Sequence, residues 1–291
     1  MSAVEAAVAP RAQGDAQAAS DFLRTGLGPT VRVGIINIMP RAESYERYLL
    51  APLRQAPHSA RPIWIRLSTH AYSSSDAAHI ARRYVTFEQA VASPGLDALI
   101  LTGAPVEELA FDQITYWREL SEILAHARTH VRTTLGLCWG GLALAHLLGI
   151  QKRAFPRKLF GAFQHRRLPS GGALPSGPDG PERFWCAHSR HSGIDDAELE
   201  RAARAGTIRL LAHGDDAGYT LFETPDHRYV MHLGHPEYEP ARLVEEWERD
   251  AKLGRPDVAP PANLDLRAPV DVWREHRAAL FANWLAIAAA R

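Results

Sequence analysis

The stretch LGLCWGG, residues 135–141, joins an apolar segment at residues 133–138 to a second apolar segment at residues 141–149. The first segment is short and predicts a buried strand, whereas the second has the composition of a helix. The glycines of the stretch allow the close backbone approach that a sharp strand-to-helix turn requires. The stretch therefore predicts a strand–turn–helix unit with Cys138 at the turn, a building block of α/β folds.

The same alternation of apolar and helical segments extends toward the N-terminus. Segments rich in β-branched residues predict strands at residues 31–38, 62–67 and 96–103, and helical spacing predicts helices at residues 44–55, 86–92 and 115–130. Strands that are buried on both faces and joined by helices form parallel sheets. We therefore expect an α/β fold with a mostly parallel sheet flanked by helices on both faces.

The second half of the chain has a different pattern. Between residues 160 and 238, short strand-like runs are separated by polar turns, which predicts a hairpin-rich insertion. Helices are expected at residues 241–254 and 270–290. The Ala-rich start of the chain is interrupted by charges, so residues 1–30 predict a loose N-terminal arm and residues 31–291 a single domain.

The composition excludes several classes of protein. The chain has 291 residues, 46% of them hydrophobic, which is normal for a globular protein. Its 33 basic and 33 acidic residues cancel, whereas a nucleic-acid-binding protein usually needs a basic excess. No apolar run approaches the roughly 20 residues that span a bilayer. With two cysteines and no secretory signal pattern, we expect a cytoplasmic enzyme that acts on small molecules, without nucleic-acid or membrane partners.

Cys138 is the sharpest chemical signal. A cysteine at the N-terminus of a helix has its thiolate favoured by the helix dipole, so we expect a lowered thiol pKa. The backbone N–H of Trp139 can then donate to the oxyanion that forms when the thiolate attacks a carbonyl. The alternative is that Cys138 packs as a small apolar side chain, as many buried cysteines do.

A nucleophilic cysteine needs a base, and the segment GHPEY, residues 234–238, offers the best candidate. Residues two apart in an extended chain project to the same side, so Glu237 can reach the ring of His235 and hold its tautomer. The alternative is a solvated histidine and glutamate at the end of a strand. A metal site is disfavoured, because the His pairs at 188/191 and 232/235 lie on strand-like segments without a second cysteine nearby.

Several motifs occur in an order that is typical of one family. They are IINIMP (residues 35–40), LTGAPVE (101–107), YWREL (116–120), LGLCWGG (135–141), KLFGAF (158–163), HSRHS (188–192), GHPEY (234–238), WREH (273–276) and FANWL (281–285). Over residues 31 to 286 the chain resembles the homoserine O-acyltransferase family. The resemblance implies a class I glutamine amidotransferase-like fold with a flavodoxin-like core.

The resemblance also implies a reaction in two steps. Cys138 would take an acyl group from acyl-CoA as a thioester. The hydroxyl of the acceptor amino acid would then attack this thioester, with His235 as the general base and Glu237 orienting it. The backbone N–H groups of Trp139 and Gly103 would form the oxyanion hole. The residues implied for binding of the amino acid are Lys158, Ser189 and Arg249.

The acyl donor implied by the resemblance depends on Glu107. In this family a glutamate at this position is associated with acetyl-CoA, and a glycine with succinyl-CoA. A succinyl group ends in a carboxylate, and two like charges at about 4 Å repel by about 4 kcal/mol at an effective dielectric constant near 20. We therefore expect acetyl-CoA as co-substrate, with succinyl-CoA as the alternative, and no permanently bound cofactor. The resemblance further implies a homodimer.

One segment departs from the family pattern. After IMP the family shows a lysine and then Glu-Thr-Glu, whereas here the run is RAESYE, residues 41–46. Because this run follows the first strand, at the edge where α/β sheets carry their sites, it is expected to alter the acceptor. A serine O-acyltransferase is therefore an alternative to a homoserine O-acyltransferase. A cysteine hydrolase or a glutamine amidotransferase on the same scaffold is a further alternative.

Overall fold

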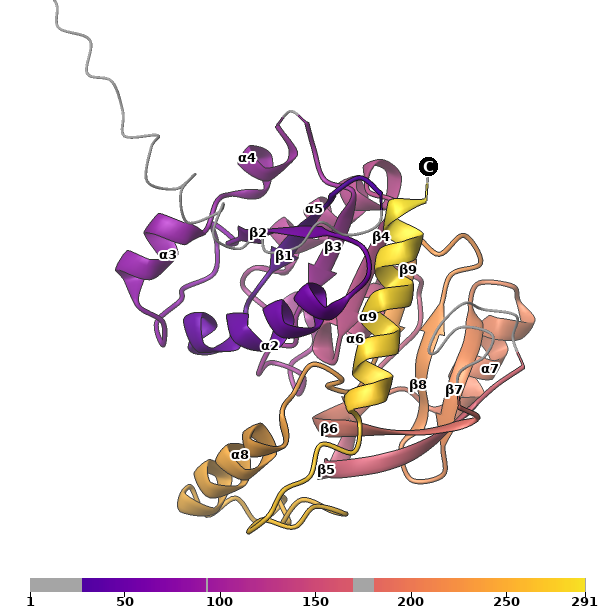
Figure 1. The fold of residues 1–291 in the computed structure, drawn as a ribbon. Coiled ribbons are helices and arrows are strands. Elements are labelled where there is room, and N and C mark those ends of the chain that lie inside the picture. The colour runs from indigo at the N-terminus through magenta and orange to yellow at the C-terminus, as the bar shows by residue number, and fades with distance from the viewer. Residues whose placement is uncertain (1–27, 93, 170–180, 291) are drawn as a thin grey trace, which may run out of the picture.

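The computed structural model describes residues 28–92, 94–169 and 181–290, so most of the expected N-terminal arm lies outside the described residues. The described strands form one sheet in the order β2-β1-β3-β4-β9-β8-β7-β5-β6 (Figure 1). Its parallel half contains β2 (Ala60–Ile65), β1 (Val31–Ile36), β3 (Ala98–Leu101), β4 (Thr133–Leu137) and β9 (Tyr229–His232).

The remaining strands are antiparallel to their neighbours, as the hairpin-rich pattern predicts. They are β8 (Gly218–Glu223), β7 (Arg209–Gly214), β5 (Arg153–Arg167) and β6 (Arg183–Gly193). The last of the sequence-predicted hairpin strands, β9, has a double role, because it pairs antiparallel with β8 and parallel with β4. It thereby joins the two halves of the sheet.

Helices cover both faces of the sheet. One face packs against α2 (Ala42–Gln55) and α9 (Arg274–Ala289), and the other packs against α4 (Phe87–Val91), α5 (Trp117–His130), α6 (Trp139–Leu147) and α7 (Asp196–Arg204). Successive side chains of a strand point to opposite faces, and Ile35 and Ile36 of β1 accordingly belong to different core clusters. The unbroken apolar runs in the sequence therefore reflect burial on both faces.

Three further elements complete the described part. The helix α8 (Pro240–Lys252) projects beyond the sheet, below the start of α9 in Figure 1. The helix α3 (Ala77–Arg83) and the short 3-10 helix η1 (Phe111–Gln113) lie in connections. The sequence patterns do not predict α3 or α7, which have few apolar residues: each buries one side chain, Ile80 and Leu199 respectively. In the described ranges, the helices are too short or too polar to cross a membrane.

The pairing of β4 with β9 positions the site. Leu137 pairs with His232, and the backbone N–H of Cys138 donates to the carbonyl of His232 at 2.8 Å. Parallel neighbours end at the same edge of a sheet, so the segments after β4 and β9 meet there. The one-domain organisation of residues 31–291 stays a prediction, which the continuity of the sheet supports.

Candidate active site

Cys138 occupies the turn between β4 and α6, at the N-cap of the helix. Its φ of 50° and ψ of −114° lie in a region that non-glycine residues rarely adopt, which is typical of strained functional turns. Two glycines make the turn possible. A Cβ atom on Gly140 would lie 2.3 Å from the carbonyl oxygen of Leu101, and one on Gly136 would lie 2.5 Å from that of Gly140. The predicted strand–turn–helix unit is therefore present, with α6 beginning directly after Cys138.

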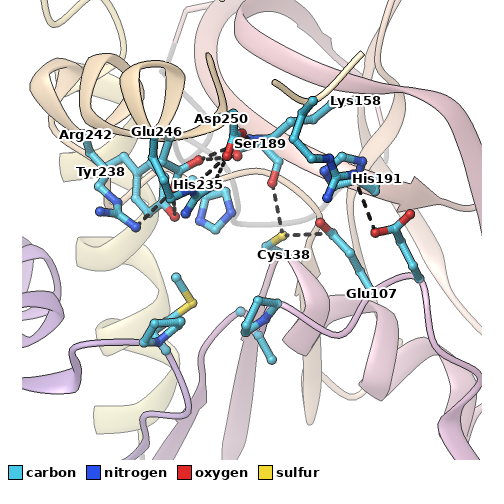
Figure 2. A pocket seen from close by; sticks show the side chains of 18 of the residues that line it. Glu107, Cys138, Lys158, Ser189, His191, His235, Tyr238, Arg242, Glu246 and Asp250 are labelled. Atoms are coloured by element: carbon cyan, nitrogen blue, oxygen red, sulfur yellow. Dashed lines mark hydrogen bonds and ion pairs between the residues drawn. The ribbon is translucent and has the colours of Figure 1, made fainter. Parts of the chain in front are cut away.

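The structure brings Cys138 and His235 together in one pocket, although they come from two distant segments (Figure 2). Glu237 lies next to His235, outside the lining of that pocket. The His235 Nδ1 lies 2.7 Å from the Glu237 Oε1, and His235 and Cys138 line the same pocket. Since Nδ1 is engaged with Glu237, Nε2 is the nitrogen that is available to the thiol. The backbone N–H of His235 donates to the carbonyl of Ala187 at 2.7 Å, which anchors the loop. All three side chains are buried.

The expected lowering of the Cys138 pKa is wrong for the substrate-free site. Burial raises the pKa of this thiol, since a thiolate is poorly solvated there, and the nearby Glu107 carboxylate raises it further. The interaction with His235 acts in the opposite direction but does not prevail. In contrast, the acidic partners Cys138 and Glu237 raise the pKa of His235 against the effect of its burial. The raised thiol pKa opposes proton transfer and the raised pKa of His235 favours it, so His235 is the group that is suited to accept the thiol proton.

Glu107 lies on the other side of the thiol. Figure 2 shows the two side chains next to each other. The Glu107 Oε2 is 4.0 Å from the Cys138 Sγ, and burial raises the pKa of its carboxyl to about 7. Its backbone carbonyl accepts hydrogen bonds from Ser192 at 2.7 Å and from Lys152. The side chain is thus held where it contacts any group bound to the sulfur, and it is only partly ionised at neutral pH.

Both groups expected to form an oxyanion hole border the nucleophile. Trp139 is the first residue of α6, so its amide has no acceptor within the helix. Gly103 packs closely against both reacting side chains, because a Cβ atom there would lie 3.4 Å from the His235 Cε1 and 3.5 Å from the Cys138 Cβ. The position is consistent with a backbone N–H that faces a developing oxyanion.

A polar pocket of about 230 Å³ opens beside the thiol. The residues expected to bind the amino acid all line it: Lys158, Ser189 and Arg249. The Lys158 Nζ lies 2.8 Å from the Asp250 Oδ2 and 3.5 Å from the Glu246 Oε2, and the Ser189 hydroxyl donates to the same Glu246 oxygen at 2.5 Å.

Two acidic residues of this pocket are missed by the sequence analysis. Glu246 and Asp250 lie four residues apart on α8, so they share one helix face, and this spacing in EEWERD is a signal that could have found them. The charges of Lys158 and Arg242 hold the pKa of Glu246 at about 2, despite its burial. Glu246 is therefore ionised, and the negative charges of Glu246 and Asp250 are each paired with a cation of the pocket.

A cluster of Cys186, His232 and His276 has its potential ligand atoms within 4.8 Å of one another. The His232 Nδ1 accepts the backbone N–H of Gly234 at 3.0 Å, so the proton of the neutral ring resides on Nε2. That nitrogen faces His276 at 3.0 Å and has no lone pair to offer a metal ion. Burial also raises the pKa of the Cys186 thiol, which keeps it protonated. These contacts argue against a metal ion at this cluster.

The divergent run at residues 41–46 does not line the pocket, although the preceding Met39 and Pro40 do, so its effect on the acceptor stays a prediction. Glu46 instead binds Arg83 and His79, each at 2.7 Å, on the far side of α2. Tyr45 of the same run reaches the Glu237 carboxylate, with 2.5 Å between the hydroxyl and Oε1.

The chain is similar to known proteins over most of its length. A family model described as homoserine O-succinyltransferase matches residues 27–290. A homoserine O-acetyltransferase of Brevibacillus brevis is 36% identical over 261 residues, which cover 88% of this chain and 83% of that protein. One from Bacillus subtilis is 34% identical over 258 residues, which cover 87% and 84%, respectively.

Solved structures show the fold. A glutamine amidotransferase from Thermotoga maritima covers 89% of this chain and 99% of its own, with a TM-score of 0.56 at 13% identity. One from Methylobacillus flagellatus covers 89% and 95%, with a TM-score of 0.52 at 14% identity. The fold is thus that of class I glutamine amidotransferases, as expected. By its match to the family model over nearly the whole chain, the protein belongs to the homoserine O-succinyltransferase family of acyltransferases.

Proposed function

We propose that this protein transfers the acetyl group of acetyl-CoA to the side-chain hydroxyl of homoserine, through a thioester on Cys138. The observation that carries the proposal is the convergence of Cys138 and His235 in one pocket, with Glu237 bound to His235 and Glu107 beside the sulfur. The relatives named homoserine O-acetyltransferase, at about 35% identity, support the acceptor and the donor.

In the first step the Cys138 thiol transfers its proton to the Nε2 of His235, and the sulfur attacks the carbonyl carbon of acetyl-CoA. The negative charge on the carbonyl oxygen faces the amides of Trp139 and Gly103. The intermediate then collapses, the bond to the CoA sulfur breaks, and His235 returns its proton to that sulfur. Glu237 keeps the imidazole oriented and stabilises its cationic form throughout.

In the second step the homoserine hydroxyl takes the place of CoA. It transfers its proton to His235, and its oxygen attacks the acetyl carbon on Cys138. Collapse of this intermediate releases the O-acetyl amino acid, and the thiol recovers its proton from His235. Because His235 accepts and returns a proton in both steps, one base suffices for the whole reaction.

The pocket beside the thiol offers a partner for each end of an amino acid. Glu246 and Asp250 supply negative charge for the ammonium group, and Lys158 and Ser189 hold these carboxylates in place. Arg249 is half-exposed and binds Asp250, so one face of its guanidinium remains available for the substrate carboxylate. Glu107 then lies against the methyl group of the acetyl thioester, where a succinyl carboxylate would meet it.

A panel of donors and acceptors tests the proposal. Acetyl-CoA and succinyl-CoA are each combined with homoserine, serine or water, and free CoA is measured, with Cys138→Ala as the control. We expect the fastest turnover with acetyl-CoA and homoserine, and an acetylated Cys138 in the absence of acceptor. Faster turnover with serine would show that serine, and not homoserine, is the acceptor. CoA release that is independent of any amino acid would instead indicate a hydrolase.

The resemblance also implies a homodimer and a cytoplasmic location. Both stay predictions, and sedimentation of the purified protein tests the first of them.

A further inference from the structure

Tyr45 is the one residue of the divergent run 41–46 that touches the proposed catalytic residues. Its hydroxyl donates to the Glu237 Oε1, which also accepts the Nδ1–H of His235 at 2.7 Å. The other carboxylate oxygen, Oε2, is buried without a hydrogen-bond partner among the described residues. The carboxylate that orients His235 thus rests on two hydrogen bonds, and Tyr45 supplies one of them.

The surroundings hold Tyr45 in this position. It projects from α2 and is buried, and its ring packs edge-on against Tyr48 and Tyr238, with ring centroids 5.9 and 6.3 Å away. Tyr238 in turn stacks on the ring of His235, at 4.0 Å between centroids. Burial and the Glu237 charge raise the pKa of the Tyr45 hydroxyl, so it remains a donor. The contact is therefore a directed hydrogen bond inside a packed aromatic cluster.

We infer that Tyr45 is a positioning residue that acts through Glu237 to set the orientation and basicity of His235. The inference rests on the proposed function, in which His235 is the base. A hydrogen bond to a carboxylate withdraws part of its charge, so it weakens the pull of Glu237 on the imidazole proton. Tyr45 thereby keeps His235 in the neutral form that accepts the thiol proton, over a wider range of pH.

The inference makes a specific prediction for Tyr45→Phe, which keeps the ring and removes the hydroxyl. Without the hydrogen bond from Tyr45, the Glu237 oxygen that faces His235 keeps more of its negative charge. This charge stabilises the protonated imidazole, so the pKa of His235 rises. We expect the rate of acetylation of Cys138 to fall by about 10- to 100-fold at neutral pH, the usual effect of losing a hydrogen bond to a charged group. We also expect the acidic limb of the pH–rate profile to move to higher pH.

Other groups must not be mistaken for His235 in that profile. The titratable groups that face the His235–Glu237 pair are Tyr45 of α2, Glu107, Cys138, Cys186 and His188 of β6, His232 of β9, Tyr238 and Glu246. Burial keeps the two tyrosines and Cys186 protonated, and it keeps His188 and His232 neutral. Glu107 titrates near neutral pH, but it does so equally in both variants, so only the difference between their profiles is interpreted.

The experiment measures the burst of CoA released on mixing enzyme with acetyl-CoA, without acceptor, between pH 5.5 and 9. Tyr48→Phe is the matched control, since Tyr48 is also buried on α2 but binds Arg47, at 2.7 Å, rather than Glu237. We expect this control to retain the wild-type acidic limb. Thermal unfolding of each variant shows whether it is folded.

A second measurement guards against a merely structural effect. In a Glu237→Ala background, the change of Tyr45 to Phe should reduce acetylation less than twofold, because the residue through which it acts is absent. An equal loss in both backgrounds, or a slower Tyr45→Phe variant with an unmoved acidic limb, would overturn the inference. If the wild-type protein itself forms no acetyl-enzyme, the proposed function fails instead, so the two failures are distinguishable.

Discussion

The charge of Glu107 should make the choice of acyl donor depend on pH. The carboxylate lies 4.0 Å from the nucleophilic sulfur, and burial raises its pKa to about 7. A group with this pKa is about one tenth ionised at pH 6 and about nine tenths ionised at pH 8. A succinyl tail carries its own carboxylate, so the ionised enzyme repels it by about 4 kcal/mol at a separation of about 4 Å and an effective dielectric constant near 20.

That repulsion is large enough to exclude succinyl-CoA from the ionised form, so the neutral form carries almost all succinyl transfer. The neutral fraction falls about tenfold between pH 6 and pH 8. We therefore expect kcat/KM for acetyl-CoA, divided by kcat/KM for succinyl-CoA, to rise about tenfold over this range. Because kcat/KM reports the free enzyme, the pH dependence of Cys138 and His235 is common to both donors and cancels in the ratio.

The assay measures CoA release with each donor at saturating homoserine, at pH steps of half a unit. Glu107→Gln is the matched variant, since it keeps the shape of the side chain and removes the titration. Its donor ratio should not change with pH and should lie near the wild-type ratio at low pH. A wild-type ratio that stays flat from pH 6 to pH 8 would refute the reasoning, and so would a glutamine variant that shows the same rise.

Three further outcomes follow from the structure. Since burial raises the pKa of Cys138 above its ordinary value of 9.0, the rate of its alkylation by iodoacetamide should still increase beyond pH 9. An alkylation rate that reaches a plateau below pH 8 would contradict this. Glu246 has its pKa lowered from 4.5 to about 2, so it stabilises the fold above pH 4.5, and this contribution is lost as the pH falls toward 2. Glu246→Gln should therefore cost on the order of 3 kcal/mol in urea unfolding at pH 7 and about 1.4 kcal/mol at pH 3. An equal cost at both pH values would exclude the charge as the cause. Gly140→Ala places a Cβ atom against the backbone at the end of β3 and should lower the melting temperature far more than Gly149→Ala. A Cβ atom on Gly149 meets nothing within 4 Å, so that variant costs about 1 kcal/mol through its positive φ. Equal melting temperatures would show that the turn is not tightly packed.

The local chemistry of the site could be predicted from short segments. The glycines around Cys138 predict a strained turn, since close backbone contacts at such a turn exclude side chains. The two-residue spacing of His235 and Glu237 predicts their contact, which is observed at 2.7 Å. Each of these inferences concerns atoms that the covalent chain keeps near one another, so local geometry suffices for them.

The partners of these segments could not be predicted in the same way. His235 reaches Cys138 because β9 lies beside β4, and this pairing depends on the order of all strands in the sheet. The contact of Tyr45 with Glu237 joins residues 192 positions apart, and the sequence of the divergent run that contains Tyr45 does not indicate it. Apolar periodicity shows which side of a helix is buried, but it does not show which other segment covers that side.

What the sequence determined by itself is the α/β class, the turn at Cys138 and the His–x–Glu pair, because each depends on steric rules that act over a few residues. What only the tertiary structure decided is the electrostatics of the site. The helix N-terminus indicated a lowered thiol pKa, yet the thiol pKa is raised, because the solvation of a charge depends on every atom that displaces water around it. Those atoms come from β4, β6, the loop after β3 and the segment after β9, and only the folded chain assembles them.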